Sequence, residues 1–210
     1  MGAPLADAPL AGGQRISMNV EVAVAKIEKY ASNESGDTLE IIERPHGGLS
    51  VVLVDGQSSG KGAKAVSNLV AHQAIALLAN GVRDGAAARA AHDHLLTHRR
   101  GLVSATLNLI SVDLVTQTLV ISRNNPCPVV LGDADSVRLL EGPCNPIGIY
   151  PRTKPEITEI PLAAPTLVLA FTDGFWHIHQ RDQGKTLNVM AAVESFLAGE
   201  FSSAQAMVDS

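Results

Sequence analysis

Residues 49–80 read LSVVLVDGQSSGKGAKAVSNLVAHQAIALLAN, and this stretch decides the fold. The apolar run at 51–54 has the length of a strand that is buried on both faces. It ends at Asp55-Gly56, and a loop of small residues follows at 57–60. Apolar residues then recur at helical spacing, which predicts a helix over 61–80. A buried strand therefore delivers one carboxylate to a glycine-rich loop, where an acid needs a partner because an unpaired buried charge is unfavourable.

Composition sets the class of protein. The chain has 210 residues, a net charge of −5 and no basic block, so nucleic-acid binding is disfavoured. Its apolar runs are of strand length, which predicts no membrane span. Cys127 and Cys144 stand in no paired or metal-ligand spacing, which is typical of reduced thiols in a cytoplasmic protein. We expect a disordered tail at 1–16, rich in Ala, Pro and Gly, and a single domain at 17–210.

The order of the remaining elements predicts the fold class. Alternating or wholly apolar runs predict strands, and longer periodic runs predict helices. The expected strands are 17–30, 38–43, 102–113, 119–122, 128–131, 137–140, 156–161 and 166–171, and the further helices are 84–98, 187–197 and one capped at 202–203. Strands and helices are segregated along the chain, which indicates an α+β fold with antiparallel pairing.

A second strand ends as the opening one does. The apolar run 166–171 is followed by Thr172-Asp173-Gly174, and Asp37 closes a turn at 33–37. If the two strands are neighbours that point the same way, Asp55 and Asp173 meet at one rim, and Asp37 can join them. Converging carboxylates need cations, and an oxygen-only ligand set favours Mg²⁺ or Mn²⁺ over Zn²⁺. Two such ions can share a water and clamp a phosphate for in-line attack.

Simpler interpretations compete for the same residues. Asp-Gly is the commonest tight-turn dipeptide, and residues 177–181 could return as a strand after Asp173. Strand, glycine loop and Lys61 are similar to a phosphate-binding P-loop, but three residues instead of four separate Gly56 from Gly60. Gly62 also stands where the metal-binding hydroxyl of a P-loop belongs.

Two further groups have modest weight. His94 and His98 lie at i and i+4 on the second helix and could form a metal pair, although a solvated helix face explains them better. Ser58 and Ser59 lack the G-x-S-x-G surroundings of a nucleophile and are better explained as loop hydroxyls. We therefore expect direct attack on phosphorus without a covalent intermediate. His46 is the nearest candidate for the general acid.

The ordered set of motifs resembles the SpoIIE-like branch of the metal-dependent type 2C (PPM) protein phosphatases. Residues 54–65 look like its D-G-x-x-x-G-x-x-A loop and helix, and Gly36-Asp37 is similar to its early Gly-Asp. Residues 145–149 are similar to its P-L-G segment, and Phe171-Thr172-Asp173-Gly174 matches its [YF]-[ST]-D-G. The resemblance implies an αββα sandwich of two antiparallel sheets flanked by helices. It also implies Mn²⁺ or Mg²⁺, as one or two ions, and hydrolysis of phosphoserine or phosphothreonine in a protein.

The resemblance also assigns roles. Asp37 and Asp55 would bind the first metal, and Asp55 would bridge to a second metal held by the Gly56 carbonyl and Asp173. The family has a final acidic ligand in a D-D-x-T strand, whereas this sequence ends at Asp209-Ser210. We therefore expect the domain to lack its last strand. A catalytically degenerate phosphoprotein-binding or scaffold domain is the alternative.

The substrate expectation rests on architecture. We expect no sensor or membrane domain ahead of the catalytic part, as in the stand-alone stressosome phosphatases of the RsbX type. Those relatives act on STAS-domain proteins in bacterial stress signalling. The resemblance therefore implies a phosphorylated STAS-domain partner, similar to RsbS or RsbR, for a cytoplasmic monomer or weak dimer.

Overall fold

The computed structural model describes residues 18–26, 35–45, 47–176 and 188–209. The expected tail at 1–16, His46 and the alternative returning strand at 177–181 lie outside these ranges. The chain divides into two compact units. The five-stranded unit comprises Glu28–Pro126 and Gly142–Leu162, and the three-stranded unit comprises Met1–Ile27, Cys127–Glu141 and Ala163–Ser210. The expectation of one phosphatase domain over 17–210 stays a prediction.

The five-stranded unit is built on an antiparallel sheet with the strand order β1-β2-β3-β4-β7. Its strands are β1 Asp37–Glu43, β2 Gly48–Gly56, β3 Ala105–Asp113, β4 Thr118–Asn124 and β7 Glu156–Pro161. The apolar strand β2 lies between β1 and β3, which satisfies its backbone on both edges. The strand that the opening stretch predicts is therefore an inner strand of this sheet.

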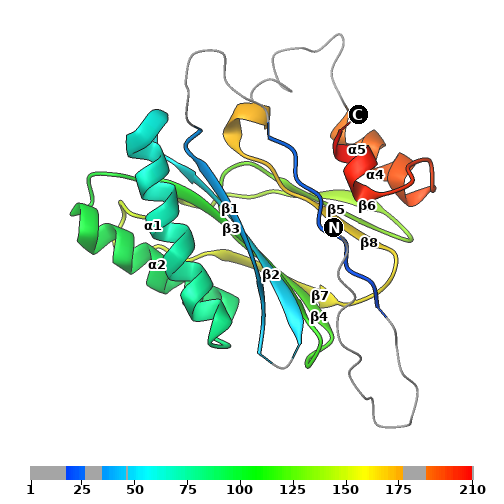
Figure 1. Cartoon of the computed structure of the whole chain (residues 1–210), viewed down its shortest axis with the longest axis horizontal. Helices are drawn as coiled ribbons and strands as arrows, with labels where there is room; N and C mark the ends of the chain where they lie inside the picture. Colours follow the sequence, from blue (N-terminus) through cyan, green and yellow to red (C-terminus); the bar gives the residue numbers. More distant parts are fainter. Residues whose placement is uncertain (1–17, 27–34, 46, 177–187, 210) are drawn as a thin grey trace. The chain divides into compact units, whose positions relative to one another are not determined.

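Two helices, α1 Gly60–Ala79 and α2 Asp84–Arg99, cover one face of this sheet (Figure 1). Burial alternates along β2, so that Val52 and Val54 are fully buried against the helices while their neighbours are half-buried. Val70 of α1 and Leu95 of α2 belong to the same apolar cluster. The helices thus fix which face of β2 is the core face, and every second side chain of β2 faces the other way.

A buried polar network joins the start of α2 to the sheet. Arg44 Nη1 lies 2.8 Å from Asp84 Oδ2, and both side chains are only 7% exposed. Arg44 also donates to Ser50 and Ser111, and the Ser111 hydroxyl donates to Asp84. Each charge in this network therefore has both a partner and additional hydrogen bonds, which is the condition under which a buried ion pair is tolerated.

The three-stranded unit has the strand order β6-β5-β8. Its elements are β5 Val129–Asp133, β6 Val137–Leu140, β8 Thr166–Leu169, α4 Val189–Leu197 and α5 Ala204–Val208. Val193 of α4 is fully buried with Val130 and Phe171 in one apolar cluster. Asn188 and Ser203 cap the two helices through their side-chain oxygens, and the Ser203 cap confirms the expected helix start.

The predicted fold class is confirmed: two antiparallel sheets have flanking helices, and the chain is of α+β type. The strand expected at 17–30 is wrong over its described part, because residues 18–26 form no strand beyond an isolated bridge at Asn19. The Glu21 side chain instead accepts from the Ala204 amide, and the Val24 carbonyl accepts from the Gln205 side chain, so this segment is held by the α5 region and not by a sheet ladder. In the described ranges, no helix has the length and apolar character needed to cross a membrane.

We predict that Arg44→Ala lowers the free energy of unfolding by about 3–5 kcal/mol, because it leaves Asp84 as a buried charge without its cation. Urea titration followed by circular dichroism measures the change. Arg138→Ala is the matched control, because Arg138 pairs with Asp133 at 3.1 Å but is 44% exposed. The control should lose less than about 1 kcal/mol. Equal losses in the two variants would show that burial of the Arg44 pair has no special weight.

Candidate active site

Asp37 and Asp55 are directly opposite each other in the β1–β2 ladder. Side chains of opposite residues share one face of an antiparallel sheet, with Cβ atoms about 4.5–5.5 Å apart. The sequence predicted that Asp37 closes a turn, but Asp37 is the first residue of β1. Strand pairing therefore brings together two of the three predicted site carboxylates.

The two carboxylates point away from the helices. Thr38, the neighbour of Asp37, hydrogen-bonds through its hydroxyl to Ser67 and Asn68 of α1, both at 2.7 Å. Val54, the neighbour of Asp55, is fully buried against the helix layer. Because side chains alternate along a strand, Asp37 and Asp55 lie on the opposite face, and both are half-buried.

Glycines at the ends of these strands allow α1 to approach. A Cβ at Gly56 would lie 2.1 Å from the carbonyl oxygen of Ala63, in the first turn of α1. A Cβ at Gly36 would lie 2.9 Å from the Ala63 Cβ. The Gly56 amide also donates to the Gly36 carbonyl at 3.3 Å. The glycine before Asp37 and the glycine after Asp55 therefore have a steric role in setting the position of both acids.

Lys64 of α1 binds the start of β1, in the corner formed by Asp37, Asp55, Gly36 and Gly56. Its ammonium donates to the Asp37 carbonyl at 2.6 Å and to the Thr38 hydroxyl at 2.9 Å. These bonds hold the start of β1 on the first turns of α1. Lys64 thus fixes the backbone that carries the Asp37 carboxylate.

Asp173 belongs to the three-stranded unit. The condition that the strand before Asp173 neighbours β2 is not met, because β8 pairs with β5 in the other sheet. Residues 173–176 are helical, and the Trp176 amide bonds back to the Thr172 carbonyl. Asp173 therefore begins a helical turn and not a hairpin, and its role beside the other two acids stays a prediction.

The matching sequence family is described as Stage II sporulation protein E (SpoIIE), and it matches residues 45–210. The chain belongs to the SpoIIE family. No curated protein matches the sequence. The predicted resemblance to SpoIIE-like phosphatases is thus confirmed at the level of the family.

Solved structures share the fold. The PP2C phosphatase domain with a regulatory fragment of SpoIIE from Bacillus subtilis is 19% identical with a TM-score of 0.69, and the match covers 84% of this chain and 51% of that one. RsbX in complex with magnesium is 10% identical with a TM-score of 0.63, covering 86% and 87%. A structure described as the bacterial stressosome, a modular system adapted to control secondary messenger signalling, is 16% identical with a TM-score of 0.65, covering 86% and 84%. The chain spans about half of the SpoIIE chain, and these likenesses show a PP2C-type fold.

The family-like segment at 145–149 is held by backbone bonds. Ile147 forms a bridge with Ala105, the first residue of β3. The Gly148 amide donates to Nδ1 of His92 at 3.0 Å. Burial lowers the pKa of His92 below its ordinary value of 6.5, and the nearby Asp93 carboxylate opposes this shift. A neutral imidazole therefore accepts the Gly148 hydrogen bond, a contact that sequence reasoning missed because only the fold brings α2 to this segment.

The sheet face with the acids has a second polar row. Asn108 of β3 is opposite Leu53 and Arg123, so its amide faces the same way as Asp55. Asn108 is 1% exposed and Arg123 is 4% exposed. The Asn108 amide finds no hydrogen-bond partner within the described part of the chain. Alternation alone would have flagged Asn108, since it interrupts a run of apolar residues in β3.

The donor set of this corner fits a hard divalent cation. Asp37 and Asp55 offer carboxylate oxygens on one face, and oxygen donors are the ligands of Mg²⁺ and Mn²⁺. Across the described residues, no group of three or more His, Cys, Asp or Glu side chains has the arrangement of a metal site. His94 and His98 stack with ring centroids 5.9 Å apart, and no third ligand of this kind joins them in the part of the chain that the structure describes.

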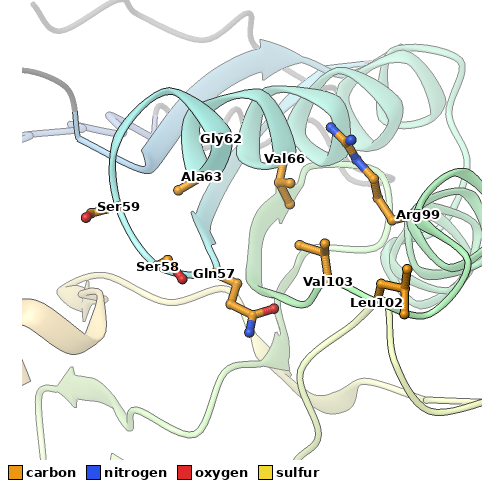
Figure 2. Close-up of a pocket in the computed structure, with 9 residues that line it drawn as sticks. All are labelled: Gln57, Ser58, Ser59, Gly62, Ala63, Val66, Arg99, Leu102 and Val103. Atoms are coloured by element: carbon orange, nitrogen blue, oxygen red, sulfur yellow. The ribbon is translucent and has the colours of Figure 1, made fainter.

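A pocket of about 420 Å³ opens beside the loop that follows Asp55 (Figure 2). Gln57 and Ser58 line one side, and Arg99 and Leu102 line the other. The sequence predicted a strand from residue 102, but β3 begins at Ala105. Residues 102–104 are therefore a loop, and Leu102 and Val103 of this loop line the pocket.

We predict that Gly56→Ala destabilises the protein by at least about 1–3 kcal/mol, because the added Cβ meets backbone and not a movable side chain. Gly62→Ala is the matched control in the same loop and helix, since a Cβ there meets nothing within 4 Å. The control should be neutral or stabilising by up to about 1 kcal/mol. Thermal unfolding of both variants measures the difference, and an equally mild Gly56→Ala would contradict the close contact with α1.

We predict that stability falls as the pH drops through 6.5 and that His92→Gln reduces this slope. The unfolded chain takes up a proton near pH 6.5 that the buried imidazole resists, so the unfolded state gains from acid until the pH passes the lowered folded pKa. Urea midpoints at a series of pH values measure the slope. His98→Gln, which removes an exposed imidazole from the same helix, should keep the wild-type slope. An unchanged slope in His92→Gln would refute the assignment.

Proposed function

We propose that this chain is a metal-dependent phosphatase that hydrolyses phosphoserine or phosphothreonine in a protein. In this proposal Asp37, Asp55, the Gly56 carbonyl and Asp173 hold Mg²⁺ or Mn²⁺, as one or two ions. The observation that carries the proposal is the register that sets Asp37 opposite Asp55 at the end of a buried strand in a SpoIIE-family chain.

The chain's own residues supply position and charge. Two carboxylates on one sheet face attract a divalent cation and also need it, because like charges opposite each other in a ladder repel. Gly36 and Gly56 let α1 close on this corner, and Lys64 holds the start of β1. Bound Mg²⁺ or Mn²⁺ would supply Lewis-acid chemistry, which activates water and neutralises charge on a phosphoryl group.

We propose a phosphorylated STAS-domain protein, similar to RsbS or RsbR, as the substrate in a bacterial stressosome pathway. Support comes from the fold similarity to RsbX and to the structure described as the bacterial stressosome. The cysteine usage of the sequence favours the cytoplasm as the place of action. In this proposal the chain acts as a monomer or weak dimer.

A phosphoprotein-binding domain without activity is the second candidate. One observation favours it: the described residues contain no group of three acidic, histidine or cysteine ligands arranged for a metal. Such a domain would bind the phosphorylated protein and protect the phosphate without hydrolysing it.

We predict that Asp55→Asn lowers kcat/KM by at least about 100-fold, since even outer partners of metal ligands contribute 10–100-fold. The substrates are a phosphorylated STAS-domain protein and an aryl phosphate, each assayed with Mn²⁺ and with Mg²⁺. Calorimetric titration of the metal gives a readout that does not depend on activity, and Asp55→Asn should weaken this binding.

Glu43→Gln is the control, because Glu43 lies on the same strand and face as Asp37 but roughly 20 Å along β1. It removes the same charge and should behave as wild type. If wild type and Asp55→Asn are equally inactive with either metal while the phosphorylated protein still binds, the degenerate domain is the correct interpretation. If wild type hydrolyses the aryl phosphate but acts poorly on the phosphorylated STAS-domain protein, only the proposed substrate is refuted.

A further inference from the structure

The pocket beside the Asp55 loop is formed by residues of the five-stranded unit alone. Figure 2 shows the loop with Gln57 and Ser58 on one side and Arg99 and Leu102 on the other, with Val66 of α1 between them. Its volume of about 420 Å³ is enough for one or two amino-acid side chains of a bound segment. No residue of this pocket has a role in the chemistry proposed above.

Arg99 gives the pocket its charge. Among the described lining residues it is the one that carries a charge, and none is acidic. Its Nε is buried and finds no hydrogen-bond partner in the described part of the chain. A cation in the last turn of α2 is favourable for the helix, but that does not satisfy a buried donor. An anionic group in the pocket would compensate the charge of the half-buried Arg99.

Leu102 gives the pocket an apolar side. Its side chain is 79% exposed, the most of any large apolar residue in the described chain. Val66 and Val103 extend this apolar lining. An exposed leucine next to the half-buried Arg99 indicates a ligand with both an acid and an apolar side chain, and a polypeptide segment meets both conditions.

The loop between the pocket and the acids is held in a fixed form. The Gln57 side-chain oxygen accepts from the Ser104 backbone amide at 2.9 Å, and the Gln57 backbone amide donates to the Ser104 carbonyl at 3.1 Å. Ser58 has a φ of +76°, a strained conformation for a residue with a side chain. Gln57 follows Asp55 by two residues, so the pocket begins within about 7 Å of the Asp55 backbone. A segment that lies across this loop can reach the carboxylates with one residue and the pocket with another.

We propose that this pocket recognises an acidic residue next to an apolar residue in the phosphoprotein substrate, a few residues from the phosphorylated side chain. Arg99 pairs with the acid, and Leu102 packs against the apolar side chain. This inference rests on the proposed function, because it assumes that a phosphoprotein lies at Asp55. It adds a specificity determinant that does not take part in hydrolysis.

Binding of labelled phosphoserine peptides of roughly nine residues, about 30 Å when extended, tests the proposal by fluorescence anisotropy. The acidic peptides carry Glu-Leu on the N-terminal or the C-terminal side of phosphoserine, and the neutral peptides carry Gln-Leu at the same places. The readout is the ratio of the two Kd values. Wild type should prefer one acidic peptide by about tenfold or more, as expected for a hydrogen bond to a charged group.

Arg99→Gln should bring this ratio close to one, and Arg99→Lys should keep part of it because the charge remains. Arg89→Gln is the matched control, since it removes an exposed arginine from the same helix, and it should keep the wild-type ratio. Replacement of the peptide leucine by serine should weaken binding to wild type more than to Leu102→Ser.

A ratio near one in wild type for both placements of the acid would overturn the proposal. So would an Arg99→Gln ratio equal to that of Arg89→Gln. Because the ratio comes from binding, it remains decisive if wild type hydrolyses neither the peptides nor an aryl phosphate, a result that would refute the proposed function alone. Circular dichroism of each variant establishes that the folded protein is being compared.

Discussion

The close contact between Gly56 and the first turn of α1 is the constraint on which the five-stranded unit depends. A Cβ at Gly56 would lie 2.1 Å from the Ala63 carbonyl, so no other residue fits without a backbone shift. This contact lets α1 follow the inner strand β2 after a loop of only a few residues. The helix then covers Val52 and Val54, which makes one face of β2 the core face. Asp55, which alternates with them, must face the other way.

The direction of Asp55 in turn sets the partner that it can have. In an antiparallel ladder the register decides which side chain stands opposite, and here it is Asp37. A single-residue slip would place Asp37 on the helix side, among the Thr38, Ser67 and Asn68 hydrogen bonds. Those bonds, together with the Lys64 bonds, therefore fix the register of β1 against β2. Asp37 and Asp55 are adjacent because Thr38, on the other face of β1, is hydrogen-bonded to α1.

Local patterns in the sequence predicted much of this corner. Asp55 and α1 could be located from the sequence because their signals are local. These signals are an apolar run, Asp-Gly, a loop of small residues and a segment with helical periodicity, and they follow one another directly along the chain. The position of Asp37 opposite Asp55 could not be predicted, because register depends on two strands and no local pattern contains it. Asp37 was therefore expected in a turn. The Glu21 segment was expected to be a strand for a similar reason. Its alternation is real, but Glu21 bonds to α5, which is more than 180 residues away in the sequence. His92 was missed because Gly148 reaches it only in the folded chain.

The fold fixes the position of the two acids and leaves the pocket residues free to change. Asp37 and Asp55 stand on paired strands, whose backbone is fixed by ladder bonds and by the helices behind it. Arg99 and Leu102 instead stand where α2 ends and before β3 begins, at positions that carry no ladder bonds. Substitutions there alter a surface without disturbing the register of the sheet. If Asp37 and Asp55 carry the proposed hydrolysis, residues of this second kind are the ones that can change selectivity while the acids remain in place.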